Sequence, residues 1–240
     1  MQILSNLIAS LKGKDYPVQQ VLTGAYWTAV VSRRCGLAST FRDEGHPHDR
    51  AVKDVGHLTQ KSALELAQYA LSDHLLEASI GMAAINSLIE VDEKKFTEKN
   101  ASQVLMEKGE RKDIAIVGHF PFIPELRKKA RNLWVFEMRP KEGDLPPEKA
   151  REILPRCDIV GITGTAFITH TLDDLLRWAA GKSILLMGPT TPLTPFLFHY
   201  GIQVLSGTMV VDKGEAFRYI SQGATFREIR GVRRVTMMIE

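Results

Sequence analysis

The hydrophobic pattern changes along the chain near residue 100, and the change predicts two parts of different architecture. Up to that point the pattern predicts strands first and helices afterwards, which is typical of a small α+β unit. Beyond it, short apolar runs alternate with helical stretches, which is typical of strand–helix units around a parallel sheet. We therefore expect an α+β domain over residues 1–99 and a Rossmann-like layered domain over residues 100–240.

The first part is expected to contain a surface helix, three strands and two further helices. Apolar residues at helical spacing predict the surface helix over 1–12. Thr59 is expected to cap the second helix and Ser72 the third, which is apolar on most of its surface and therefore buried between layers. The polar segment 90–100 is the best candidate linker. β-rich composition predicts an antiparallel meander with strands at 17–23, 27–32 and 37–41.

The second part starts with a helix that Asn100 can cap, followed by a strand at 113–117. That strand has no polar alternation, which suits a parallel sheet buried on both faces. Gly118 ends it, so the sequence changes there from strand to turn to helix. The tail, 226–240, is predicted to be either an extra helix or an edge strand. Four more parallel strands are expected at 133–138, 158–163, 182–187 and 202–205.

Composition excludes several classes of protein. The chain is 44% apolar and 25% charged, as in ordinary globular proteins, which excludes disordered and fibrous classes. A net charge of +3 without a clustered basic face argues against nucleic acid as a partner. No apolar stretch approaches the roughly 20 residues that span a membrane, and no signal peptide is recognisable, so we expect a cytoplasmic protein. Cys35 and Cys157 are expected to be reduced thiols.

The loops that follow the predicted strands hold the candidate chemistry, because open α/β sheets bind ligands at the carboxyl ends of their strands. Gly118, His119 and Phe120 follow the first strand but lack the glycines of a dinucleotide fingerprint. Glu137 lies about 20 residues beyond Gly118, where an acidic residue would hold ribose hydroxyls. The alternative for the first of these loops is a plain helix entry, and the alternative for Glu137 is an exposed carboxylate without a role.

Two further loops carry hydroxyls at helix starts. Thr163, Gly164, Thr165 and His170 follow the third strand, and the nearby Thr171 and Asp174 suggest a capping box. Gly188, Pro189, Thr190 and Thr191 follow the fourth strand, where backbone N–H groups and a helix dipole could capture a carboxylate or phosphate. A rigid connector is the alternative reading of this second loop.

A metal site is a separate hypothesis. His46 and His48 are two residues apart, so both imidazoles could face one side of an extended segment, and His119 could join them. Asp43, Glu44 and Cys35 are further donors for zinc or another borderline transition metal. No spacing matches a structural zinc motif, and neither GxSxG nor HExxH occurs. A divalent transition metal is the one cofactor class that these residues suggest.

Several separated motifs in the right order resemble one prokaryotic family, the putative heavy-metal-chelation domain. They are VGHFP, EMRP, GDLP, ITGTAFITHTLDDLL, GPTTPLTP and LSGTMVVD, from about residue 110 onward. The preceding WTAVVS, GLAST and ASIGMAAINSL are similar to the domain that accompanies this family, which has an enolase N-terminal-like fold. The resemblance implies a cleft shared by the two domains that handles metals or metal-chelating molecules. His170 stands where family members usually have asparagine.

Three functional hypotheses stay open after the sequence analysis. The first is a protein, enzymatic or not, that binds a small anionic molecule or metal chelate in the cleft between the domains. The second is a transferase with a nucleoside cofactor such as S-adenosylmethionine, and the third is a non-enzymatic metal-handling or partner-binding protein. Whether a homodimer forms is also open. The expected ligand-binding residues are Gly118, His119, Phe120, Glu137, Thr163, Gly164, Thr165, His170, Gly188, Pro189, Thr190 and Thr191, and the expected metal ligands are His46, His48 and His119.

Overall fold

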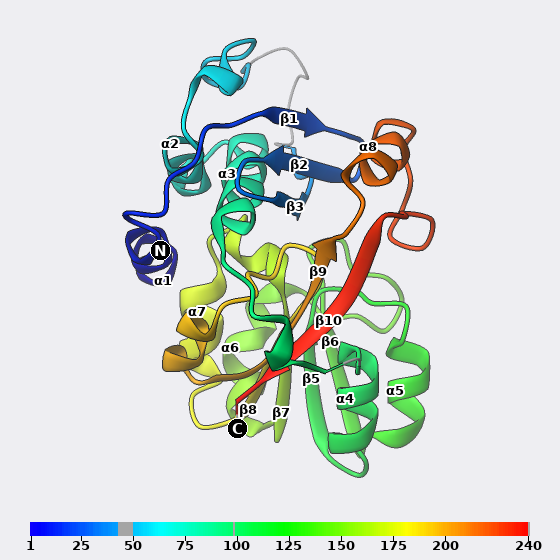
Figure 1. Ribbon diagram of the computed structural model, residues 1–240. Helices are drawn as coiled ribbons and strands as arrows, with labels where there is room; N and C mark the ends of the chain where they lie inside the picture. Colours follow the sequence, from blue (N-terminus) through cyan, green and yellow to red (C-terminus); the bar gives the residue numbers. More distant parts are fainter. Residues whose placement is uncertain (43–49, 98, 240) are drawn as a thin grey trace.

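The computed structural model contains two β-sheets joined by helices (Figure 1), and it describes residues 1–42, 50–97 and 99–239. The smaller sheet has three strands in the order β1-β2-β3. The larger sheet has seven strands in the order β4-β10-β9-β8-β7-β5-β6. This mixed α/β architecture, with one mostly parallel sheet, confirms the predicted fold class.

The smaller sheet is the antiparallel meander that the sequence predicts. One helix, α3, packs against β2 and β3, with α2 on its other side. Nearly every residue of α3 from Glu77 onward is buried, as expected for a helix that is apolar on most of its surface. The elements of this region are α1 (Gln2–Ser10), β1 (Gln20–Thr23), β2 (Trp27–Val31), β3 (Cys35–Ser39), α2 (Ala63–Ala67) and α3 (Leu75–Leu88).

The starts of α2 and α3 differ from the prediction. Ser62, not Thr59, caps α2, because its hydroxyl accepts from the backbone N–H of Glu65 while the Glu65 carboxylate accepts from that of Ser62. Thr59 lies in a preceding 3-10 helix, η1 (Leu58–Gln60). His74 is the N-cap residue of α3, and the Ser72 hydroxyl accepts from its backbone N–H.

The larger sheet is parallel from β6 to β9 and antiparallel at β10 and β4. Side chains on β5 alternate between its faces. Ile114 and Ile116 pack with α4 and α5, whereas Ala115 belongs to the core on the opposite face, which includes residues of α6 and α7. The strands are β4 (Phe96–Thr97), β5 (Asp113–Val117), β6 (Asn132–Phe136), β7 (Ile159–Thr163), β8 (Ser183–Met187), β9 (Ile202–Val210) and β10 (Val232–Met238), and the helices are α4 (Ala101–Lys108), α5 (Ile123–Lys129), α6 (Ala150–Ile153), α7 (Leu172–Trp178) and α8 (Lys213–Ser221).

Three predictions about this region need correction, and one helix was missed. The polar segment proposed as a linker contributes β4, because Phe96 and Thr97 pair with β10. The tail forms β10, which lies between β4 and β9 rather than at an edge. Thr171 precedes α7 without a side-chain cap, and α8 was not predicted at all. The predicted cap at Asn100 is confirmed as a capping box with Gln103.

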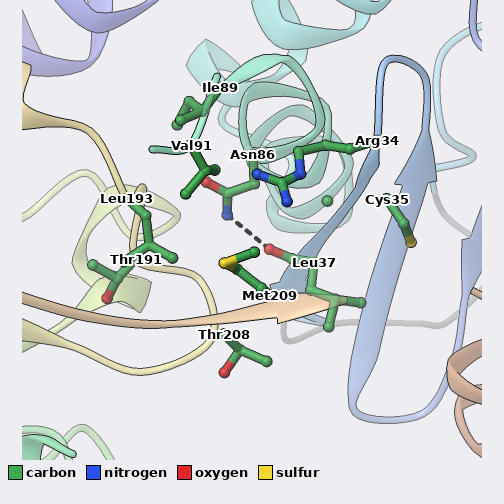
Figure 2. Close-up of a pocket in the computed structure, with 11 residues that line it drawn as sticks. Arg34, Cys35, Leu37, Asn86, Ile89, Val91, Thr191, Leu193, Thr208 and Met209 are labelled. Carbon is green, nitrogen blue, oxygen red and sulfur yellow. Dashed lines mark hydrogen bonds between the residues drawn. The ribbon is translucent and has the colours of Figure 1, made fainter. Parts of the chain in front are cut away.

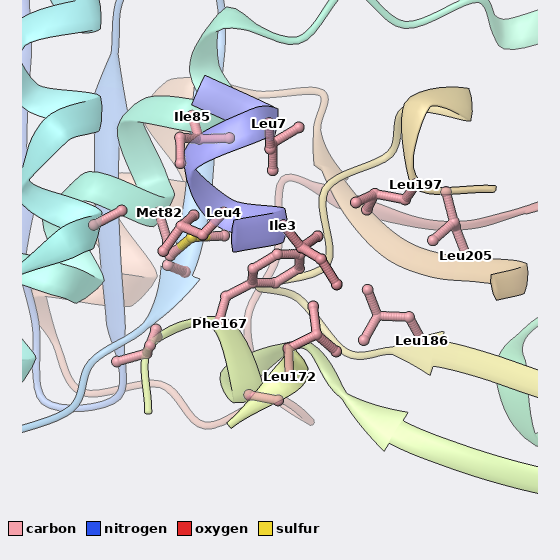
Figure 3. Packing of buried hydrophobic residues seen from close by; sticks show 14 of the residues in the cluster. Ile3, Leu4, Leu7, Met82, Ile85, Phe167, Leu172, Leu186, Leu197 and Leu205 are labelled. Atoms are coloured by element: carbon pink, nitrogen blue, oxygen red, sulfur yellow. The ribbon is translucent and has the colours of Figure 1, made fainter. Parts of the chain in front are cut away.

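One continuous apolar core connects the two sheets (Figure 3). Phe167, only 1% exposed, lies in the 3-10 helix η6 (Gly164–Phe167) that follows β7. Its ring lies beneath α1 in Figure 3, near Ile3 and Leu4, and Met82 of α3 belongs to the same cluster. Because residues of both sheets share this core, neither sheet is expected to unfold independently. Within the described residues, no helix is long and apolar enough to cross a membrane.

We predict that Phe167→Ala lowers the free energy of unfolding by about 3–5 kcal/mol, because it leaves a cavity where the elements meet. Urea unfolding should be followed by fluorescence in variants that retain only Trp27, in β2, or only Trp134, in β6. Both probes should report one shifted transition. Tyr26→Ala, at a side chain 52% exposed, is the control and should change stability by less than about 0.5 kcal/mol. Separate transitions for the two probes would contradict the shared core.

Candidate functional site

The carboxyl ends of β5 and β7 form the switch point of the larger sheet. β5 lies between β6 on one side and β7 on the other, so the chain runs from β5 to one edge and then continues from β7 toward β8 and β9. Open α/β sheets bind ligands outside the strand ends at such a point. The loops after β5 and β7 therefore frame the candidate site.

Two glycines allow the loops at the switch point to lie close together. Gly118 has a φ of +98°, and a β-carbon there would lie 3.0 Å from the Cβ of Thr163. A β-carbon on Gly164 would lie 2.6 Å from the backbone nitrogen of Thr191, in the loop after β8. Side chains at either position would push these loops apart. The structure thus brings together three loops that the sequence analysis selected, those after β5, β7 and β8.

His119 is paired with a carboxylate that the sequence analysis did not select. Its Nδ1 lies 3.0 Å from Oδ2 of Asp144, and that oxygen also accepts from the backbone N–H of Lys141. The side chain of Asp144 is 3% exposed and that of His119 is 28% exposed. A carboxylate at Nδ1 favours the tautomer that carries its proton there, which leaves Nε2 available to a ligand. A histidine oriented in this way suits acid–base chemistry.

Of the other polar groups at the site, some already accept hydrogen bonds from the protein, whereas others are donors without an acceptor among the described residues. One carboxylate oxygen of Glu137 accepts from the backbone N–H groups of Met138 and Arg139, so it stabilises its own loop. The hydroxyls of Thr163 and Thr165 are 3.0 Å apart. Among the described residues, no group accepts a hydrogen bond from the backbone N–H of His119 or of Gly164. The ring of Phe120 stacks on Phe122 beside them, with 5.2 Å between centroids.

The Gly188–Thr191 loop joins the two sheets. The Thr190 hydroxyl is fully buried and accepts from the backbone N–H of Ser39 in β3. The carbonyl of Thr190 accepts from the side-chain amide of Asn86 in α3. Gly188 donates to the carbonyl of Ser206 in β9, and Pro189 follows it. Thr191 is 2% exposed, and within the described chain its hydroxyl has no hydrogen-bond partner.

A cleft lies between β3, the end of α3 and this loop (Figure 2). The space between its atoms amounts to about 300 Å³, a volume that includes open solvent. Arg34, Asn86 and Thr191 supply polar groups, while Leu37 and Leu193 are among its apolar walls. Cys35 also lines the cleft, but burial raises the pKa of its thiol to about 12, so the thiol stays protonated at neutral pH.

His170 connects the loop after η6 to the helical region of the smaller unit. Its Nε2 donates to the carbonyl of Ala70, at 2.8 Å, and it lies beside Ile3 and Leu4 of α1. The residue has a φ of +56°, in the left-handed region. Histidine and asparagine adopt this conformation more readily than most residues, so the asparagine that the family resemblance implies at this position would suit the same backbone.

The described residues do not fit a resident metal centre. They contain no group of three or more histidine, cysteine, aspartate or glutamate side chains that could hold an ion. His119 and Asp144 offer two side chains that already bond to each other, whereas stable protein sites for zinc use three or four ligands. His46 and His48, with Asp43 and Glu44, lie outside the described residues.

Three functional candidates were missed by the sequence analysis. Asp144 lies in the GDLP motif, which marked it as part of a pattern but not as the partner of His119. Asn86 is a polar residue within a mostly apolar helix, a signal that indicates a buried hydrogen-bonding role. Arg34 has no comparable signal, because sequence does not show which of two adjacent arginines is half-buried.

The fold and these loops define a two-sheet α/β protein with a candidate ligand site at the switch point of its larger sheet. Comparison of the sequence with family models matches residues 100–239 to DUF364 and residues 5–89 to DUF4213, both described as "Putative heavy-metal chelation". The chain belongs to this family, as its motifs predicted.

Relatives are similar over nearly the whole chain. An uncharacterised protein, MJ0500, of Methanocaldococcus jannaschii is 29% identical over 214 residues, which cover 85% of this chain and 82% of the relative. The crystal structure of a DUF364 protein of unknown function from Desulfitobacterium hafniense superposes with a TM-score of 0.87 at 28% identity, covering 99% of this chain and 98% of that one. A Pyrococcus horikoshii protein of unknown function has the same fold, with a TM-score of 0.83 at 20% identity and the same coverage of both chains.

We predict that His170→Asn is tolerated better than His170→Val, by about 1 kcal/mol in the free energy of unfolding. Both variants lose the hydrogen bond to Ala70, but valine, being β-branched, also bears the cost of a left-handed backbone. Urea midpoints of the two variants measure the difference directly. Equal midpoints would show that the backbone conformation at this position does not restrict the side chain.

Proposed function

We propose that this protein binds a small anionic molecule at the switch point of its larger sheet, with His119 as the side chain that contacts the ligand. The pairing of His119 with the buried carboxylate of Asp144 is the observation that carries this proposal. It leaves one imidazole nitrogen on the accessible side of the pair, where the nitrogen can bond to a ligand or exchange a proton with it.

The balance of hydrogen-bonding groups supports an anion rather than a cation. The carboxylates of Glu137 and Asp144 already accept hydrogen bonds from neighbouring groups. The backbone N–H groups of His119 and Gly164 are unused by the described residues, and the hydroxyl of Thr165 is close by. Donors at the strand ends of an α/β sheet favour a carboxylate or a phosphate.

A metal chelate is one member of this ligand class. The described protein side chains offer too few donors for a bare ion, so the chelating molecule would have to supply most of the metal's ligands. His119 could add one donor through Nε2. In this proposal the family's description applies to the molecule that binds and not to a metal held permanently by the protein.

The nucleoside-cofactor hypothesis receives less support from the site. In that hypothesis Glu137 binds the ribose hydroxyls of the cofactor, but one oxygen of the Glu137 carboxylate already accepts hydrogen bonds from the loop after β6. The glycine fingerprint that would let a backbone approach a pyrophosphate is also absent from the loop after β5.

A thermal-shift screen should test the proposal with citrate, malonate and inorganic phosphate, with citrate preloaded with Zn²⁺ or Ni²⁺, with each metal alone and with S-adenosylmethionine. We predict that at least one anion or chelate raises the Tm. At about 100 times the dissociation constant, binding contributes about 2.7 kcal/mol, or roughly 5–10 °C for a chain of this size. His119→Ala should abolish the shift.

His199→Ala is the matched control, because His199 is an exposed histidine on the 3-10 helix η7 (Pro195–Tyr200), away from the loops that frame the site. It should leave the ligand-induced shift unchanged. Asp144→Asn should reduce the shift without abolishing it, since His119 remains but loses its orienting carboxylate. An equal shift in wild type and His119→Ala, or a shift with S-adenosylmethionine alone, would overturn the proposal.

A further inference from the structure

Arg34 is a half-buried cation without a counter-charge in contact. Its neighbour Arg33 pairs with Glu90 at 2.8 Å on the surface, whereas the guanidinium of Arg34 has no hydrogen bond or ion pair with any described residue. Figure 2 shows this guanidinium pointing into the cleft, toward Asn86. Burial lowers the pKa of Arg34, and the charge of Glu93, which is itself paired with Arg233, opposes that shift without contacting the guanidinium; a guanidinium remains charged at neutral pH. A partly desolvated charge without a carboxylate in contact is unfavourable, and an anion in the cleft would compensate for it.

Asn86 presents an unused acceptor to the same cleft. Its amide nitrogen donates to the carbonyls of Leu37, at 2.8 Å, and Thr190, at 3.1 Å. Both N–H groups are therefore engaged, which fixes the orientation of the amide. Its Oδ1 is buried and has no partner within the described chain. Because a buried acceptor without a donor is costly, this atom favours a ligand that carries an N–H or O–H group.

Thr191 adds a second unused polar atom. The residue lines the cleft and is 2% exposed, and its buried hydroxyl, which is directed toward Gly164, has no partner among the described residues. A hydroxyl can donate or accept, so it can bond to the anionic group or to the donor group of a ligand. Three residues, from the turn before β3, from α3 and from the loop after β8, thus line one cleft, and each has a polar group without a hydrogen bond to the described protein.

These groups define the chemistry of a ligand. A single guanidinium matches the planar, two-oxygen face of a carboxylate. A phosphate dianion would carry more charge than one arginine balances and would place its oxygens near Asn86 Oδ1, which repels an acceptor. The enclosed part of the cleft is small, so we expect a ligand of a few carbon atoms, for which Leu37, Ile89 and Leu193 provide apolar contact.

We propose that the cleft between β3, α3 and the loop after β8 is a binding site for a small monocarboxylate that also carries a hydroxyl or amino group. Arg34 binds the carboxylate, Asn86 Oδ1 accepts from the hydroxyl or amino group, and Thr191 completes the polar contacts. This site is built from different side chains than the one that contains His119, so either proposal can fail while the other holds.

Isothermal titration calorimetry of the purified protein should compare glycolate, lactate and serine with acetate and propionate. At least one of the first three acids should bind, and it should bind about tenfold or more tightly than the acid of similar length that lacks the donor, because Asn86 Oδ1 is then left unpaired. Inorganic phosphate should bind more weakly than that acid. Two outcomes would contradict the proposal. Either no acid of the panel binds, which would mean that water alone fills the cleft, or the hydroxyl or amino group makes no difference to the affinity.

Two variants with a matched control locate the binding. Arg34→Gln should weaken binding by about tenfold to a hundredfold, whereas Arg33→Gln, next to it but outside the cleft, should not. Thr191→Val removes a hydroxyl that the unliganded protein does not use, so it should weaken binding while the Tm of the free protein stays unchanged or rises. His119→Ala should bind the acid normally. Equal affinity of the Arg34→Gln and Arg33→Gln variants would place any bound acid elsewhere.

Discussion

The contact between the loop after β8 and the smaller sheet is the constraint on which the rest of the structure depends. The fully buried Thr190 accepts from Ser39 in β3 through its hydroxyl and from Asn86 in α3 through its carbonyl. These hydrogen bonds lie beside the continuous apolar core, so they align two sheets that apolar packing alone would hold less specifically. The cleft exists because this contact holds β3 and α3 at a fixed position against the larger sheet.

The same loop contributes to both proposed sites by different means. Thr191 lines the cleft, and both its backbone nitrogen and its hydroxyl come within 2.7 Å of the place that a β-carbon on Gly164 would occupy, at the end of β7. The loop thus has little freedom to accommodate a side chain at position 164. The hydroxyls of Thr190 and Thr191 are buried within the protein rather than exposed to solvent. The sequence predicted this loop as an anion-binding loop or as a rigid connector. Its Thr190 connects the two sheets, and the hydroxyl of Thr191 has no hydrogen-bond partner among the described residues.

In both proposals the ligand is an anion rather than a bare cation. Among the described residues, carboxylates near the switch point accept hydrogen bonds from within the protein, whereas the backbone N–H groups of His119 and Gly164 have no acceptor, and the guanidinium of Arg34 in the cleft has no carboxylate in contact. A family described by heavy-metal chelation is compatible with this arrangement when the molecule that binds the metal is the ligand of the protein. The physical reason is the number of donors: an ion needs several converging ligands, and a carboxylate needs only a few hydrogen bonds.

The sequence by itself determined the fold class, the meander, the buried helix α3 and the strands of the parallel sheet, because each follows from local periodicity and apolar runs. It also identified the loops around Gly118, Thr163 and Gly188, since loops at strand ends are recognisable from their position. Only the tertiary structure decided that β10 lies inside the sheet, that Asp144 holds His119 and that Arg34 rather than Arg33 faces a cleft. Those outcomes depend on contacts between residues distant in the chain, and their energies are set by burial and pairing that no local pattern encodes.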